Sequence, residues 1–205
     1  MVISNCKSHI DIILNYEVFK GKVLGTYLEC GANDGKTDSI SYFFEKRFNW
    51  RGILIEPQHQ LMMKCIENRA ADNIFIEKGL SDKEELIEMT IPTDNLDNAS
   101  FALSEDHIKQ LKKDGFGKSF RTDIIEVITY NNVIEQHGIK NIDLAIIDVE
   151  GYENKVLKSI MKSKVLPQVI VAEYDWSDLK ELNKIVKRKY NILKQFDNDI
   201  VYIRK

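Results

Sequence analysis

The sequence is poor in cysteine, and this excludes two common ways of stabilising a fold. Cys6, Cys30 and Cys65 are odd in number and form no Cys-x-x-Cys pair. This argues against both a disulfide framework and a zinc cluster. The three residues have the pattern of reduced cytosolic thiols, so we expect a cytoplasmic protein.

Long apolar runs and excess positive charge are also missing. The longest apolar runs, at 144–147 and 169–172, have strand length and fall far short of the roughly 20 residues that span a bilayer. Lys7, His9 and Asp11 interrupt the apolar residues of the N-terminus, so no signal-peptide core is recognised there. The formal net charge of -3 gives no general attraction to phosphate or to anionic lipid. We therefore expect neither a membrane nor a nucleic acid as partner.

What is present is the composition of a globular α/β protein. With 43% hydrophobic and 30% charged residues, a chain of 205 residues can bury one core of ordinary size, so we expect a single domain over 1–205. Strand-like runs alternate with stretches of helical periodicity, the order that builds a mostly parallel sheet with helices on both faces. The expected strands include 26–30, 52–55, 74–76, 124–129, 142–147 and 169–173.

The end of the chain departs from this alternation. Two strand-like runs, 191–196 and 200–204, are separated only by the turn residues 197–199, which predicts a hairpin. So short a connection cannot join parallel strands. A seven-stranded, mostly parallel sheet that ends in an antiparallel hairpin is typical of the Rossmann-like class I methyltransferase fold.

One segment interrupts the alternating pattern. After an extended stretch at 85–91, residues 93–121 are rich in Asn, Asp and Ser and contain a short helix with Ser104 as its N-cap. We interpret 93–121 as an insertion or lid on the substrate side, which would largely determine the acceptor. His107 lies in the short helix. We expect it to face solvent, with a role as catalytic base as the alternative.

The strongest chemical signal is the glycine loop at 29–35, where the first strand meets its helix. Ligands of such folds bind at the carboxyl ends of strands. The loop lacks the dinucleotide fingerprint GxGxxG, because Asn33 and Lys36 occupy the second and third glycine positions. It also fails as a Walker A loop, because Gly31 lies one residue too close to the Gly-Lys-Thr that starts at Gly35.

The charges beside this loop favour one kind of cofactor. Glu29 and Asp34 would repel a triphosphate but suit the cationic amino acid end of S-adenosylmethionine. Glu56 ends the second strand, about 20 residues beyond the loop, where a carboxylate accepts hydrogen bonds from ribose hydroxyls. The alternative for Glu56 is an acid that merely starts a turn before Pro57. Ser81 follows the third strand. In one interpretation it lines the adenine, and in the other it belongs to an ordinary turn.

Four motifs stand out: ECGANDG at 29–35, WRGILIEP at 50–57, KGLSDKE at 78–84 and IDVEGYENKVLKS at 147–159. At these motifs the sequence resembles the FkbM family of methyltransferases over roughly residues 25–173. The resemblance implies a class I fold, S-adenosylmethionine as donor, and O-methylation of hydroxyls, often on sugars of glycans or on small metabolites. By position it also implies that Glu29, Gly31, Asn33, Gly35 and Glu56 hold the cofactor, while Asp148 and Glu150 face the reacting centre.

Acidic residues gather where two buried strands end. Asp148 and Glu150 are two residues apart and can point to the same side, and Glu173 ends the next strand. A carboxylate that accepts the proton of an attacking hydroxyl is a general base, and Asp148 is our first candidate. A second hypothesis is that these three acids and Asp175 bind a divalent cation such as Mg²⁺. For Glu153 we expect only a favourable interaction with its helix dipole.

Aromatic residues follow the acidic strand ends. Tyr152, Tyr174 and Trp176 can stack on a sugar ring or face a sulfonium, or they can simply pack. Three classes of function remain: a methyltransferase, a module that binds S-adenosylmethionine without turnover, and a nicotinamide-dependent oxidoreductase. The last is disfavoured by the missing GxGxxG and by the terminal hairpin. The sequence determines neither the acceptor nor the oligomeric state.

Overall fold

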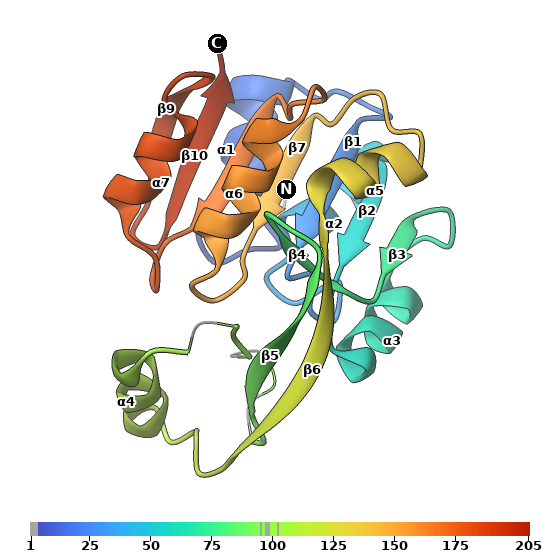
Figure 1. Cartoon of the computed structure of the whole chain (residues 1–205). Helices are drawn as coiled ribbons and strands as arrows, with labels where there is room; N and C mark the ends of the chain where they lie inside the picture. The colour runs from blue at the N-terminus through green and yellow to red at the C-terminus, as the bar shows by residue number, and fades with distance from the viewer. Residues whose placement is uncertain (1–3, 95, 97–98, 102) are drawn as a thin grey trace.

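The computed structural model describes residues 4–94, 96, 99–101 and 103–205. Its main feature is a seven-stranded sheet with the order β3-β2-β1-β7-β8-β10-β9 (Figure 1). The first five of these strands are parallel, and β10 is antiparallel to both β8 and β9. The predicted parallel sheet and terminal hairpin are thereby confirmed. In sheet order the strands are β3 (Ile74–Ile76), β2 (Arg51–Ile55), β1 (Thr26–Cys30), β7 (Leu144–Ile147), β8 (Val169–Glu173), β10 (Asp199–Arg204) and β9 (Tyr190–Gln195).

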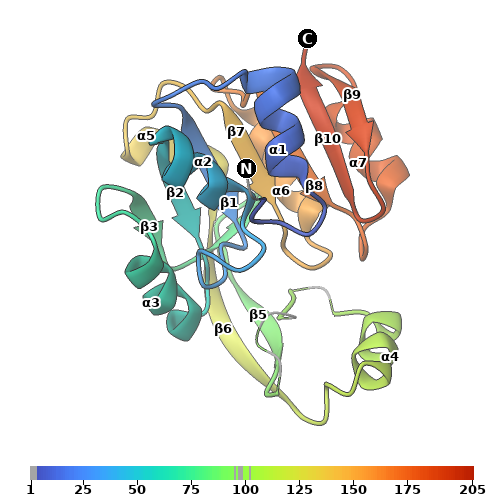
Figure 2. The same cartoon turned by 180° about the vertical axis from the view of Figure 1, so that it is seen from behind.

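Helices cover both faces of this sheet (Figures 1 and 2). One face carries α1 (Ile10–Leu14), a π-helical segment (η1, Asn15–Phe19), α2 (Ile40–Phe48) and α3 (His59–Asn68). The other face carries α5 (Tyr130–Gln136), α6 (Glu153–Lys162) and α7 (Leu179–Val186). Within the described part of the chain, no helix has both the length and the apolar character needed to cross a bilayer.

The sheet is buried on both sides, which explains its nearly continuous apolar strands. One hydrophobic cluster, with Tyr27, Phe44 and Trp50, lies under α1 to α3, and a second, with Leu157 and Tyr202, lies under α5 to α7. The strand order reverses between β1 and β7, because the chain continues on one side of β1 from β2 to β3 and on the other from β7 to β8. In such sheets ligands bind in the crevice at this switch point.

A second sheet was not expected from the sequence. It has the order β4-β6-β5 and is built from β4 (Gly79–Ser81), β5 (Glu85–Pro92) and β6 (Phe120–Thr129). It extends beyond the carboxyl ends of the main strands, as does α4 (Glu105–Lys113), which begins where the Ser104 side chain accepts a hydrogen bond from the backbone N–H of His107. The extended stretch at 85–91 and the capped helix were predicted. The pairing of β5 with β6 was missed, because it joins segments far apart in the chain.

Candidate functional site

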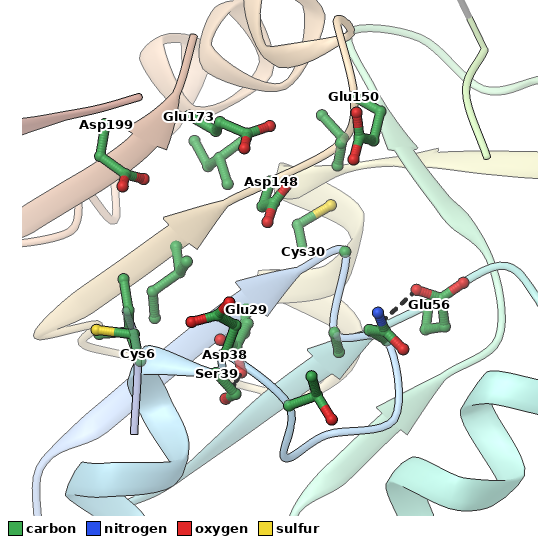
Figure 3. A pocket seen from close by; sticks show the side chains of 18 of the residues that line it. Cys6, Glu29, Cys30, Asp38, Ser39, Glu56, Asp148, Glu150, Glu173 and Asp199 are labelled. Atoms are coloured by element: carbon green, nitrogen blue, oxygen red, sulfur yellow. Dashed lines mark hydrogen bonds between the residues drawn. The ribbon is translucent and has the colours of Figure 1, made fainter. Parts of the chain in front are cut away.

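A cavity of about 880 Å³ lies at the carboxyl ends of the central strands (Figure 3). It extends from Glu56, after β2, past the glycine loop after β1, to the acidic residues after β7 and β8 and the hairpin turn. This volume is in the range of small-molecule binding sites, roughly 300–1,000 Å³. The cavity is therefore where the sequence analysis expected a ligand.

The glycine loop is held tightly against the end of β7. Gly31 has φ of +80°, and a Cβ atom on it would lie 1.7 Å from the carbonyl oxygen of Asp148. A side chain at this position would therefore push the two strand ends apart. The backbone N–H groups of Gly31 and Ala32 both donate to the carbonyl oxygen of Ile55, which ties the loop to β2 as well. Gly31 thus sets the width of the crevice.

Two predicted cofactor residues of this loop shape it without lining the cavity. Asp34 Oδ1 accepts hydrogen bonds from the backbone N–H groups of Lys36 and Thr37. Gly35, at φ +74°, packs against Cys65 and Arg69. Asp34 and Gly35 are not among the described residues that line the cavity, so their positions support a structural role.

Glu29 lies at the floor of the cavity and is buried. Its Oε2 accepts hydrogen bonds from the hydroxyls of Ser39 and Ser41, at 2.7 and 2.6 Å. Arg69 lies behind it, with Nη1 3.7 Å from Glu29 Oε2 and Nε 2.8 Å from Glu45 Oε2. The sequence analysis missed Arg69, because its position just after α3 gives no hint that the guanidinium is buried under the glycine loop.

Glu56 and Asn33 meet at the other end of the cavity. Glu56 Oε2 accepts a hydrogen bond from the backbone N–H of Asn33 at 3.1 Å, and Oε1 accepts one from that of Gln58 at 2.9 Å (Figure 3). The carboxylate is therefore fixed in orientation at the wall of the cavity.

Ser81 is placed differently from the prediction. It is fully buried in β4, its hydroxyl lies 3.5 Å from that of Tyr152, and it is not among the described residues that line the cavity. The neighbouring Gly79 and Leu80 line the cavity instead. Because successive side chains of a strand point to opposite sides, Leu80 and Ser81 cannot both face it. This argues against direct contact between the Ser81 side chain and a cofactor.

The three predicted catalytic acids come together. Oxygen atoms of Asp148, Glu150 and Glu173 all lie within 4.8 Å of one another, and Figure 3 shows them at one end of the cavity. Burial, and then the charge of Asp148, raise the pKa of Glu173 far above its ordinary value. The side chain of Asp148 is exposed to the cavity, yet it lies deep among protein atoms, and the resulting desolvation raises its pKa while the interaction with Glu173 opposes the rise. The pair therefore retains a proton that isolated carboxylates would lose.

The turn after β7 is strained and is held from both sides. Glu150 has φ of +53°, in the left-handed region that few residues with a side chain adopt. The hydroxyl of Ser100 donates to the carbonyl oxygen of Glu150 at 2.6 Å. Glu153 Oε1 accepts from the backbone N–H groups of Val149 and Gly151, and its Oε2 accepts from the Ser177 hydroxyl. Glu153 thus does more than the dipole interaction expected of it, since it organises the acidic turn.

The expectation that His107 faces solvent is wrong. Its side chain is fully buried, and its ring is stacked on Trp176 with the centroids 4.1 Å apart and the planes at 4°. His107 Nε2 lies 3.6 Å from Glu150 Oε2. The reason is that α4 turns this face toward the ends of β7 and β8. The other aromatics pack: Tyr152 lies against Phe101, and Tyr174 donates to the carbonyl oxygen of Phe196.

Three further acids line the cavity and were not singled out as candidates from the sequence: Asp38, Asp197 and Asp199. Asp199, at the start of β10, lines the cavity, and burial together with the charges of Asp175 and Asp38 raises its pKa to about 6. Asp38 also lines the cavity and pairs with Lys7 at 2.7 Å. Lys7 is the one basic residue among the described lining residues, so the cavity as a whole is acidic. Such a cavity favours a cationic ligand over a phosphate.

Comparisons with known proteins agree with this arrangement. Residues 29–197 match the family described as Methyltransferase FkbM domain, whereas no curated protein shows significant sequence similarity to the chain. A solved structure of a putative rRNA-methylase from Clostridium thermocellum has a TM-score of 0.54 at 8% identity, covering 100% of this chain and 98% of that one. The fibrillarin pre-rRNA processing protein of Methanococcus jannaschii has a TM-score of 0.51 at 14% identity, covering 92% and 70%. At these identities the likeness establishes the class I methyltransferase fold alone.

Proposed function

The chain belongs to the FkbM family of methyltransferases, and we propose that it transfers a methyl group from S-adenosylmethionine to a hydroxyl oxygen of a sugar, a glycan or a small metabolite. One observation carries the proposal: the glycine loop, Glu56 and the Asp148–Glu173 pair line the same cavity at the switch point of the sheet. A donor held along this cavity would have its reactive end near the acids.

The residues present fit S-adenosylmethionine. Gly31 lets the loop pack against the end of β7, where a side chain would collide with the Asp148 carbonyl oxygen. Glu56 lines the same cavity with its carboxylate held by two backbone N–H groups, in the position from which a carboxylate binds ribose hydroxyls in such folds. Glu29 and the acids near it suit the cationic amino acid end. When bound, this cofactor supplies an electrophilic methyl group.

Asp148 is the proposed general base. A sugar hydroxyl is a weak acid, and a positioned base that takes its proton during attack accelerates such reactions typically 10²- to 10⁴-fold. Asp148 is open to the cavity, while Glu173 retains the shared proton and keeps Asp148 as the acceptor of the pair. Glu150 extends the acidic wall on the side of α4.

A divalent cation is the alternative occupant of the acid cluster. Three carboxylates with oxygens within 4.8 Å of one another match the oxygen ligands of Mg²⁺ in kind. The proton shared by Asp148 and Glu173 already relieves part of their repulsion, so we expect methyl transfer to survive removal of metals. Activity that is lost in EDTA and restored only by Mg²⁺ would instead assign the cluster to a cation.

We also propose that the enzyme works in the cytoplasm on a small-molecule or glycan acceptor rather than on nucleic acid. Cys6, Cys30 and Cys65 are free and buried, and burial raises the pKa of each thiol, which protects it from oxidation. Both structural neighbours carry names that refer to rRNA, but an acidic cavity repels a phosphate backbone.

The first experiment is a calorimetric titration of the purified protein with S-adenosylmethionine and with S-adenosylhomocysteine. We expect micromolar binding that Glu56→Ala weakens more than tenfold, equivalent to about 1.4 kcal/mol. Glu67→Ala, an exposed acid on α3, is the matched control and should bind as the wild type does.

The outcomes separate the alternatives. Absence of binding to either compound would refute the proposal and direct attention to nicotinamide cofactors, which the missing GxGxxG and the terminal hairpin disfavour. Binding without any turnover over a broad panel of hydroxyl acceptors would support the module that binds the cofactor without catalysis.

A further inference from the structure

A second cavity, of about 440 Å³, lies between α4 and the residues that follow β7 and β8. Glu150 and Glu173 line both this cavity and the larger one. A molecule in the second cavity therefore reaches the same carboxylates as a molecule in the first. The volume lies within the range of small-molecule sites, roughly 300–1,000 Å³. The two cavities thus offer separate compartments that meet at the acids.

His107 forms part of the wall and has unmet hydrogen-bonding capacity. The residue is fully buried, and neither of its ring nitrogens has a hydrogen-bond partner within the described part of the chain. Its Nε2 points toward Glu150, with 3.6 Å between the nitrogen and Oε2. Unpaired polar atoms are costly to bury, so their presence at a cavity wall indicates that a ligand supplies the partner.

The charge of the second cavity restricts that ligand. Asp114 and Asp175 line it together with Glu150 and Glu173, and the described lining residues include no lysine or arginine. Burial lowers the pKa of His107, which favours the neutral form of its imidazole. A phosphate or carboxylate placed here would meet several negative charges and no positive one.

The hydrogen-bonding groups of the second cavity narrow the class of ligand further. A neutral imidazole has one donor and one acceptor nitrogen, whereas a carboxylate only accepts. An ammonium group only donates, so it would leave the imidazole N–H unpaired, and a phosphate only accepts, so it would face the carboxylates. A hydroxyl both donates and accepts, and it can therefore pair with His107 and with the acids at once.

We propose that the second cavity holds the methyl acceptor, that His107 selects it through its ring nitrogens, and that the part of the acceptor bound there is an uncharged hydroxyl-bearing unit rather than a phosphorylated or carboxylated one. The inference rests on the proposed methyl transfer and adds to it the location and charge class of the acceptor. His107 acts here as a specificity residue.

The test uses the full chain saturated with S-adenosylhomocysteine. A panel of neutral methyl hexosides is compared with the 6-phosphates of the same hexoses, and binding is measured by saturation-transfer NMR and by competition titration. We expect at least one neutral hexoside to bind, and to bind at least about tenfold more tightly than its phosphate.

Three variants locate the site. His107→Phe keeps a flat ring on Trp176 but removes both nitrogens, and it should weaken hexoside binding about three- to tenfold. Gln110→Trp, on the cavity side of α4, should abolish binding, while Lys109→Trp, next to it and outside the lining, should not. All three should bind S-adenosylhomocysteine as the wild type does. His107→Gln, which retains a donor and an acceptor, should recover part of the affinity if His107→Phe proves unstable.

Either of two results would overturn the proposal. One is wild-type protein that binds S-adenosylhomocysteine but none of the neutral hexosides, or that prefers the phosphates. The other is hexoside binding that Gln110→Trp leaves intact. Failure of the wild type to bind S-adenosylhomocysteine would instead count against the proposed function itself, so the two failures are distinguishable.

Discussion

At the scale of single residues, Asp148 and Glu173 face each other at the ends of neighbouring strands, and the ionisation of one depends on the other. Desolvation raises the pKa of both, and the shift is larger at Glu173, which therefore holds the shared proton. Two interacting acids lose their protons in steps that belong to the pair. The first proton lost leaves Asp148 as a base, and the second would require two neighbouring charges.

This pairing predicts the pH dependence of the reaction. The rate should decline on the acid side at a pH well above 3.8, the ordinary pKa of an aspartate, because Asp148 must be deprotonated to act. Glu173→Leu removes the donor and should move this decline to higher pH, whereas Glu173→Gln keeps an N–H donor and should move it little. The measurement is kcat/KM against pH with saturating cofactor.

Asp148→Asn should lower kcat about 10²- to 10⁴-fold at every pH. A rate profile that Glu173→Leu leaves in place would show that the pair does not control the acid side of the reaction.

Sequence reasoning found the acids and the glycine loop because parallel strands end at one edge of the sheet, so strand-end residues must converge. Glu29, Gly31, Asn33, Glu56 and the catalytic acids all line the cavity. This rule did not predict the positions of Arg69 and His107, because their roles depend on which side of a helix or loop is packed against the sheet. A helical pattern alone does not show which part of the protein a short polar helix packs against.

At the scale of elements, the turn between β7 and α6 carries the strain of the site. Glu150 lies in the left-handed region, and Glu153 holds two of the surrounding backbone N–H groups. The sequence showed a helix start with an acid in its first turn. It did not show that this acid accepts hydrogen bonds from the turn that precedes it, because those bonds depend on the strained conformation of Glu150.

Glu153→Ala should therefore lower kcat while leaving affinity for S-adenosylhomocysteine within about twofold. Misplacement of a reacting group by about 1 Å costs on the order of 10²-fold in rate, and we expect a loss of this size for the freed turn. Glu153→Gln retains one oxygen acceptor and should recover part of kcat. Single-turnover rates and calorimetry would measure the two quantities. An equal loss in binding and in rate would indicate general unfolding of the site instead.

The strands of the main sheet were predictable, because buried parallel strands are short apolar runs. The sheet formed by β4, β5 and β6 was not, although two of its strands were expected as extended segments. β6 has alternating burial along much of its length and pairs with β5 on one side and β4 on the other. Nothing local distinguishes such a strand from one that joins the main sheet.

At the scale of the whole molecule, one end of the sheet carries a concentration of acids that the rest of the fold must stabilise. The pKa values of Glu173 and Asp199 are raised by burial first and by neighbouring acids second. Away from this cluster, beneath the glycine loop, Arg69 and several hydrogen bonds hold the pKa of Glu45 at about 2 although burial opposes them. Glu45 and the acids of this cluster therefore contribute to stability with opposite signs.

The sign follows from proton linkage. Unfolded Glu173 loses its proton near 4.5, whereas in the native state it keeps the proton to much higher pH. Between these values the native state binds more protons, so the free energy of unfolding falls as pH rises. Glu173→Gln removes this penalty and should raise Tm at pH 8, by about 2–4 °C for each kcal/mol gained, but not at pH 4.

Glu45→Gln is the control of opposite sign, since a depressed pKa contributes stability above the unfolded value. It should destabilise the protein at pH 8 by up to about 3–5 kcal/mol, the cost of breaking a buried ion pair, because buried Arg69 then keeps only Glu29, 3.7 Å away, as a charged partner. Calorimetric scans of both variants at the two pH values would test these two predictions. A Glu173→Gln variant with the Tm of the wild type at pH 8 would show that the raised pKa of Glu173 does not destabilise the native state. The proton shared by Asp148 and Glu173 would then not explain how Asp148 acts as the base.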